Sequence, residues 1–142
     1  MIGAGYEKKN RARLGTATMA LWCAAFSSGC AAHLPRPDLA SLIESGKAPV
    51  IVDVRSEGEY QRDHVKGALH IPFYSLRGHA DRLPAEEGTF TVLYCEHGPR
   101  AGLGRILLWF SGYGNVRYLE GHMKAWRSDG LPVEYGMAGP ME

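Results

Sequence analysis

The sequence lacks the features that define several large protein classes. Its three cysteines are too few and too scattered for a disulfide framework or a structural zinc site. Sixteen Lys and Arg residues face fifteen Asp and Glu residues, and no basic run occurs beyond residue 13, so nothing indicates nucleic-acid binding. The composition also excludes collagen, a coiled coil, a multi-pass membrane protein and a disordered tail. A length of 142 residues, 45% of them hydrophobic, predicts one globular domain.

The N-terminal segment has the pattern of an export signal. Residues 1–13 carry four Lys and Arg residues against one Glu, and Leu14–Phe26 contains no charge. A basic region, an apolar region and small residues at the end are typical of a secretory signal. The ending Ser-Ser-Gly-Cys resembles a bacterial lipobox, although leucine is usual where Ser27 stands. We therefore predict that residues 1–29 are a signal peptide or a membrane anchor, and that a lipid modifies Cys30.

Two other interpretations of this segment remain open. Residues 14–32 are uncharged and nearly long enough to span a bilayer of about 30 Å, which would make them an uncleaved anchor. An amphipathic helix of the fold is disfavoured because the segment has no polar stripe. The signal and the anchor both predict an exported, periplasmic protein attached to the membrane through its N-terminus. Without residues 1–29, twelve Lys and Arg residues face fourteen Asp and Glu residues, and Cys95 is an unpaired thiol.

Short apolar runs alternate with helical patterns in the rest of the chain. We expect a linker at 30–37, a folded domain at 38–136 and a tail at 137–142. The strands predicted from β-branched and apolar runs are 50–54, 68–71, 90–94 and 116–119. The helices predicted are 38–46, 74–83, 100–111 and 121–128, and a polar helical turn is predicted at 57–64. This alternation predicts an α/β fold, with a small parallel β-sheet and helices on both faces.

The helix predicted at 100–111 has a regular apolar spacing. The residues on one of its faces are Leu103, Ile106, Leu107 and Phe110, and we expect this face to point inward. The aromatic residues expected in the core are Trp109, Phe110 and Trp126. Gly102 and Gly104 lack the third glycine of a dinucleotide-binding motif, and we expect them to let the helix approach the sheet closely.

Cys95 follows the strand predicted at 90–94, at the edge where open α/β sheets bind ligands. The residues predicted to bind substrate are Glu96, His97, Gly98, Pro99 and Arg100, which lead into the next helix. A turn at a helix start predicts an anion cradle, in which the Cys95 thiol is ionised in a shallow bowl of inward-facing amides. Gly98 permits an unusual backbone conformation, and Arg100 adds a positive charge at the rim. The alternative is a small buried hydrophobic cysteine, which the order of these elements disfavours.

Four segments, in order across residues 37–135, resemble the rhodanese family of sulfurtransferases. The segments are Val50–Tyr60 (VIVDVRSEGEY), His64–Pro72 (HVKGALHIP), Tyr94–Ala101 (YCEHGPRA) and Leu119–Pro132 (LEGHMKAWRSDGLP). Asp63 and Lys66 stand where the family commonly has glycine and proline, and His122 replaces the second glycine of a pair. We expect none of these three departures to touch the Cys95 loop.

The resemblance implies a covalent, two-step sulfur transfer with Cys95 as the catalytic residue. The Cys95 thiolate takes the outer sulfur of a small donor such as thiosulfate, and a thiol or cyanide then removes that sulfur. No metal or organic cofactor is implied. Glu96 and His97 leave the identity of the donor open, because an acidic residue beside the loop disfavours a dianion unless it points outward.

Two alternatives to sulfur-transfer catalysis remain. Phosphatases and arsenate reductases of the same architecture resemble a Cys-x5-Arg loop, and the segment from Cys95 to Arg100 is one residue shorter. A module that only carries or senses sulfur would also keep Cys95 and Gly98.

The remaining polar residues are interpreted as parts of the fold. The residues expected to form structural ion pairs are Asp53, Arg55 and Glu59. His64 and His70 are not accompanied by other potential metal ligands, and we expect them to make structural contacts within the fold. We expect His97 to be the only histidine beside Cys95.

Overall fold

A computed structural model of the protein describes residues 32–86 and 88–136. The predicted signal segment 1–29, the predicted lipidation site Cys30 and the predicted tail 137–142 lie outside the described residues. Among the helices of the described part, none is long and apolar enough to cross a membrane.

A five-stranded parallel sheet forms the centre of the fold, in the order β1-β6-β5-β2-β4. Its strands are β1 (His33–Leu34), β2 (Val50–Asp53), β4 (Leu69–His70), β5 (Thr91–Tyr94) and β6 (Val116–Leu119). β5 is the middle strand and lies between β6 and β2. Because both neighbours are parallel to β5, the three strands end at one edge, and the segment after β5 leaves the centre of that edge.

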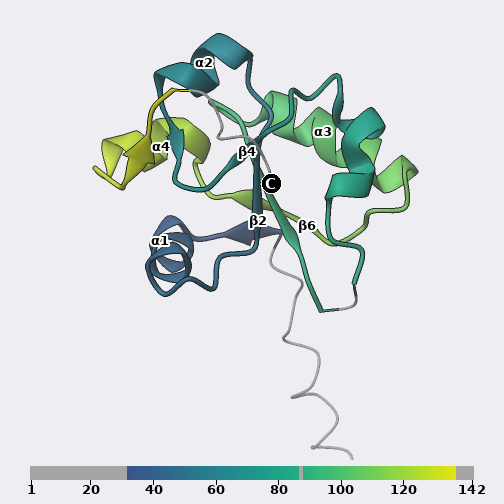
Figure 1. Cartoon of the computed structure of the whole chain (residues 1–142), viewed down its shortest axis with the longest axis horizontal. Coiled ribbons are helices and arrows are strands. Elements are labelled where there is room, and N and C mark those ends of the chain that lie inside the picture. The colour runs from purple at the N-terminus through teal and green to yellow at the C-terminus, as the bar shows by residue number, and fades with distance from the viewer. Residues whose placement is uncertain (1–31, 87, 137–142) are drawn as a thin grey trace, which may run out of the picture. The chain divides into compact units, whose positions relative to one another are not determined.

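Helices cover both faces of the sheet (Figure 1). The helices are α1 (Arg36–Glu44), α2 (Glu57–Arg62), the 3-10 helix η1 (Leu76–Arg82), α3 (Pro99–Phe110) and α4 (His122–Ser128). One apolar cluster joins the sheet to α1 and α4, for example through Leu39 and Trp126. A second cluster joins the opposite face to α3 and η1, for example through Leu108 and Leu76. The predicted α/β class is confirmed.

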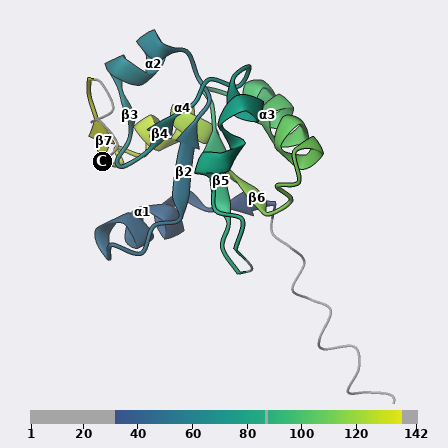
Figure 2. The same cartoon turned by 45° about the vertical axis from the view of Figure 1, so that its right-hand side comes forward.

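Three very short strands were not among the predicted elements. β1 lies in the segment assigned to a linker, where the Tyr118 amide donates to the Ala32 carbonyl at 2.8 Å. β3 (His64–Val65) and β7 (Val133–Glu134) form an antiparallel pair, seen side by side in Figure 2. A strand of two residues is too short to show an alternating pattern, so only the pairing reveals it.

The segment predicted as an α-helix at 74–83 forms the 3-10 helix η1 instead. His79, with φ of −124°, interrupts the helical conformation inside η1. Gly78 has low helix propensity, and Pro84 stops the segment soon after it begins. These residues explain why a tighter and shorter helix replaces the expected one.

The predicted inward face of α3 is wrong, because that face points to solvent. The large apolar side chains of α3 that are exposed are Leu103 (52%), Ile106 (53%), Trp109 (64%) and Phe110 (71%). The residues that α3 buries instead are Ala101, Gly104 and Leu108. Of the three aromatic residues expected in the core, only Trp126 is fully buried.

Close approach to the sheet explains this orientation of α3. A β-carbon on Gly104 would lie 2.6 Å from Leu76 Cδ1 and 3.3 Å from Leu93 Cδ2, so only glycine fits there. The prediction for Gly104 is therefore confirmed, whereas Gly102 has open space around it. Small residues let the helix backbone pack tightly, and the larger apolar residues are left on the outer side.

Candidate active site around Cys95

Cys95 is the first residue beyond the middle strand β5 and has 1% of its surface exposed. It belongs to the apolar cluster on the face covered by α3 and η1. The amide of Gly98 donates a hydrogen bond to Cys95 Sγ at 3.0 Å. Gly98 has φ of +123°, a conformation that residues with side chains rarely adopt. The sulfur is therefore deeper than the shallow bowl we predicted, and one loop amide is directed at it.

Other amides of this loop have no acceptor among the described residues. In the loop and the first turn of α3, four backbone N–H groups have no acceptor in the described part of the chain: those of Glu96, His97, Arg100 and Ala101. Along α3, the first amide that donates to a backbone carbonyl is that of Gly102, which donates to the Gly98 carbonyl at 2.9 Å. Unpaired donors at a helix start favour an anion. The loop can therefore hold a negative sulfur species with backbone groups.

His122 lies against the Cys95 loop, which corrects two expectations. Its Nδ1 accepts a long hydrogen bond of 3.5 Å from the Cys95 amide. Its Nε2 lies 3.1 Å from the position that a β-carbon of Gly98 would take. A departure from the family pattern therefore touches the loop, and His97 is not the only histidine beside Cys95. The sequence feature that marked His122 as unusual was its position, where the family commonly has the second glycine of a pair.

The backbone at His122 is unusual as well. With φ of +56°, His122 is the only non-glycine residue at positive φ in the described chain. It begins α4, whose next amide, that of Met123, donates to the Cys95 carbonyl at 3.0 Å. Burial lowers the pKa of His122 below its usual value, and the nearby His33 and His97 lower it further. His122 is therefore neutral at neutral pH, with its proton on Nε2 when Nδ1 accepts.

The Glu96 side chain is held by two arginines. Arg55 Nη1 donates to Glu96 Oε2 at 3.2 Å, and Arg127 Nη2 donates to Glu96 Oε1. Both guanidinium groups also contact Asp63. The negative charge of Glu96 is therefore compensated by these two cations, and its carboxylate does not act as an isolated anion beside the sulfur.

Arg55 forms the buried centre of this ionic network. It is fully buried and donates to Asp53 through Nε and Nη2, with distances of 2.8 to 3.1 Å. Burial alone would lower the pKa of Arg55, but its hydrogen bonds to Asp53 and the negative charge of Asp53 raise the pKa above the usual value. The structural ion pair that we predicted for Asp53 and Arg55 is thus present.

Arg100 pairs with Glu59 instead of standing free at the rim. Its Nη1 and Nη2 donate to the two Glu59 carboxylate oxygens at 2.6 and 2.8 Å. This hydrogen bonding holds the pKa of Glu59 far below its usual range. The pair ties α2 to the start of α3, and it neutralises the positive charge we expected beside the thiol.

The other histidines predicted to make fold contacts do so. His64 stacks on the Tyr60 ring with 3.8 Å between ring centroids, and His70 Nε2 contacts the Arg55 carbonyl at 3.0 Å. In the described segments, no group of three or more His, Cys, Asp or Glu side chains could hold a metal ion. The Gly98 amide contacts the Cys95 sulfur, the His122 imidazole contacts the Cys95 amide, and His97 is an exposed residue of the same loop.

A model of the family described as "Rhodanese-like domain" matches residues 36–129. The chain belongs to the rhodanese family. The rhodanese resemblance in four sequence segments and the parallel sheet with helices on both faces agree with this assignment.

Individual relatives support the same rhodanese assignment. An uncharacterized protein of Synechocystis is 36% identical over 86 residues, which cover 61% of this chain and 47% of that protein. The thiosulfate sulfurtransferase GlpE of Pseudomonas fluorescens is 28% identical over 109 residues, which cover 76% of this chain and 94% of that protein. The chain spans between about a third and a half of the length of the first curated relatives it matches.

A solved structure shows the same fold. The crystal structure of the Alr3790 protein from Anabaena matches with a TM-score of 0.65 at 27% identity. The match covers 74% of this chain and 94% of that chain. The arrangement around β5 is thus that of a rhodanese-like domain.

Proposed function

We propose that this rhodanese is a sulfurtransferase that moves sulfane sulfur through a persulfide on Cys95. The observation that carries the proposal is the hydrogen bond from the Gly98 amide to Cys95 Sγ. Membership of the rhodanese family and the similarity to a thiosulfate sulfurtransferase support the same chemistry.

The first step loads the cysteine. The Cys95 thiolate attacks the outer sulfur of a donor such as thiosulfate, and a new S–S bond forms at Sγ. The S–S bond of thiosulfate breaks, and its electron pair leaves with sulfite. Cys95 then carries a persulfide anion, which the Gly98 amide and the unpaired amides at 96, 97 and 100 stabilise.

The second step unloads the cysteine. An acceptor thiolate, or cyanide in an assay, attacks the outer persulfide sulfur and forms its own bond to that sulfur. The S–S bond to Cys95 breaks, and its electron pair returns to Sγ as thiolate. The cycle closes without net oxidation or reduction of the protein.

The surroundings of Cys95 bear on which donors it accepts. The Glu96 carboxylate is held by Arg55 and Arg127, and the Arg100 guanidinium is held by Glu59. Side-chain charges near the loop are therefore already paired. We propose that backbone amides, together with His97 and His122, bind the sulfur donor instead of charged side chains.

The test is sulfur loading and turnover of the protein and its Cys95→Ser variant. After thiosulfate treatment, the protein gains about 32 Da, the mass of one sulfur atom, at Cys95, and a thiol removes it. Thiosulfate:cyanide turnover is expected in the protein and absent in Cys95→Ser. Loading at Cys23 or Cys30 alone, or equal turnover in the variant, would contradict the proposal.

A sulfur carrier is the second candidate function, because Cys95 has only 1% of its surface exposed. A carrier would form the same persulfide on Cys95 and release it slowly to free thiols. The ratio of loading to turnover separates the two functions. Full loading with negligible cyanide turnover favours the carrier, and many turnovers per protein favour the enzyme.

A further inference from the structure

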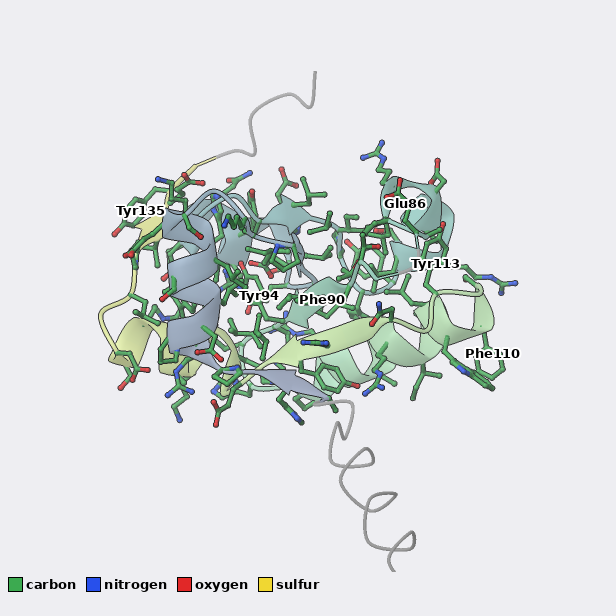
Figure 3. All side chains as sticks on the ribbon, turned by 90° about the horizontal axis from the view of Figure 1, so that it is seen from below. Glu86, Phe90, Tyr94, Phe110, Tyr113 and Tyr135 are labelled. Atoms are coloured by element: carbon green, nitrogen blue, oxygen red, sulfur yellow. The ribbon has the colours of Figure 1, made fainter. Side chains whose placement is uncertain are left out.

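The outer side of α3 carries an unusual apolar surface, which we name the α3 apolar face. It consists of the exposed side chains Leu103, Ile106, Trp109 and Phe110. Figure 3 shows Phe110 at one end of the molecule, with Tyr135 at the other. The helix contains no Asp or Glu, and its cations are Arg100 and Arg105. Exposed apolar residues gathered on one helix face mark a contact surface, because scattered ones are the norm.

A surface pocket of about 300 Å³ lies beside the α3 apolar face. Its lining residues are Arg105, Ile106, Trp109, Tyr113, Gly114 and Tyr118. The Arg105 guanidinium lies over the Tyr118 ring, 5.2 Å from its centroid. The pocket therefore combines aromatic walls with one cation that no carboxylate of the described chain pairs.

The first strand of the described chain, β1, lies against Tyr118, one of the residues that line this pocket. The His33 ring of β1 lies 5.3 Å from the Tyr118 ring, between centroids. The Ala32 carbonyl accepts a hydrogen bond from the Tyr118 amide. Cys30, the residue predicted to carry a lipid, precedes Ala32 by two positions in the sequence, so the predicted anchor segment joins the described domain at this edge.

We propose that the α3 apolar face is a membrane-contacting surface, which lies in the headgroup region of the bilayer to which the N-terminal segment attaches the protein. The proposal rests on the membrane attachment predicted from residues 14–30 and is independent of the sulfur chemistry. Interfacial helices bury their apolar side about 5–10 Å into the boundary between headgroups and acyl chains. Trp109 and Arg105 suit that boundary, because both combine an apolar body with a polar group.

Charge favours a lipid surface over a second copy of this chain. An isologous dimer through the middle of α3 would bring two copies of Arg105 toward each other. No acidic residue of α3 could compensate them, whereas anionic lipid headgroups would. Membrane contact through a second site also strengthens attachment, because the second of two linked binding events is intramolecular.

The test is quenching of Trp109 fluorescence by brominated lipids. The full chain is placed in phosphatidylethanolamine and phosphatidylglycerol vesicles, in a Trp22→Phe background because Trp22 lies in the apolar N-terminal segment. Trp126 is fully buried and serves as the constant reference. We expect bromolipids to quench the Trp22→Phe protein and to leave the Trp22→Phe/Trp109→Phe protein unquenched.

Matched variants separate contact from attachment. Ile106→Ser and Phe110→Ser are expected to lower the quenching of Trp109. Tyr135→Ser is the control outside α3, because Tyr135 is about as exposed as Phe110, and it is expected to leave the quenching unchanged. Sulfur loading of Cys95 is expected to persist in all of these variants. Unquenched Trp109 in vesicle-bound protein, protein that does not bind vesicles, or a dimer that Ile106→Ser dissociates would each overturn the proposal.

Discussion

The imidazole of His122 occupies the side of Gly98 where a side chain would stand, with Nε2 3.1 Å from the position of a Gly98 β-carbon. Both residues have positive φ, +56° for His122 and +123° for Gly98. The turn before α4 and the loop after β5 are thus fitted to each other. A change in either one is expected to move the amide that donates to Cys95 Sγ.

Gly98→Ala is expected to abolish sulfur transfer and to destabilise the fold by about 1–3 kcal/mol, since it combines a strained φ with a close contact. Urea unfolding measures the stability, and persulfide loading of Cys95 measures the site. Gly112→Ala is the matched control, because Gly112 has φ of +89° but open space around it. It is expected to lower stability without affecting loading.

The contact itself is tested by a double variant. If the His122 side chain contributes to the loss of unfolding free energy in Gly98→Ala, that substitution destabilises the protein less in a His122→Gly background than in the unchanged protein. The coupling free energy is read from the four unfolding midpoints. Additive effects of the two substitutions would show that backbone strain alone is responsible.

Glu59→Gln is expected to strengthen binding of thiosulfate. The substitution removes the carboxylate that pairs with Arg100 and leaves a positive charge close to the Cys95 loop. We expect a lower KM for thiosulfate, and a stability loss of only about 0.5–1 kcal/mol because the pair is partly exposed. Steady-state kinetics at constant ionic strength measures the change.

Glu57→Gln is the control for this prediction. Glu57 lies in the same helix, α2, and contacts Gln61 instead of an arginine. Its substitution is expected to leave the KM for thiosulfate unchanged. A higher KM in Glu59→Gln would mean that the ion pair is needed to hold the start of α3 in place.

The fold could be predicted because its signals are local. β2 and β5 are short runs rich in β-branched and apolar residues, and a helical pattern follows each of them in the sequence. The orientation of α3 could not be predicted in the same way. Periodicity records hydrophobicity, whereas the packing of α3 depends on the small size of Gly104 against Leu76. The sheet therefore faces the small residues, and the large apolar ones point outward.

The candidate site could be predicted only in its contiguous part. Cys95 and Gly98 belong to one loop, and their relationship follows from neighbouring positions in the chain. His122 is 27 residues beyond Cys95, and the two meet only because β6 lies next to β5. The direction of the Glu96 side chain is set by Arg55 and Arg127, which lie on two other parts of the chain.

Glu96→Gln is expected to destabilise the protein by about 1–3 kcal/mol, because it removes one charged acceptor from the fully buried Arg55 and one from the partly exposed Arg127. Urea unfolding gives the measurement. Asp129→Asn is the control, since Asp129 pairs with Arg36 at the surface at 2.6 Å. An exposed pair contributes about 0–1 kcal/mol, so equal effects of both substitutions would argue against a structural role of Glu96.

His122 is expected to make stability fall as the pH decreases through the ordinary histidine range. Its folded pKa is lowered by burial and then by His33 and His97, whereas the unfolded chain titrates near about 6.5. Below that pH, His122 binds a proton in the unfolded chain but not yet in the folded protein. The free energy of unfolding therefore decreases as the pH falls from the unfolded pKa to the folded pKa. His122→Gln removes this titration. Between about pH 7.5 and 5.5, the protein should lose more stability than the variant, measured by urea unfolding in parallel. An NMR titration midpoint for His122 at or above about 6.5, or parallel stability curves, would contradict the lowered pKa.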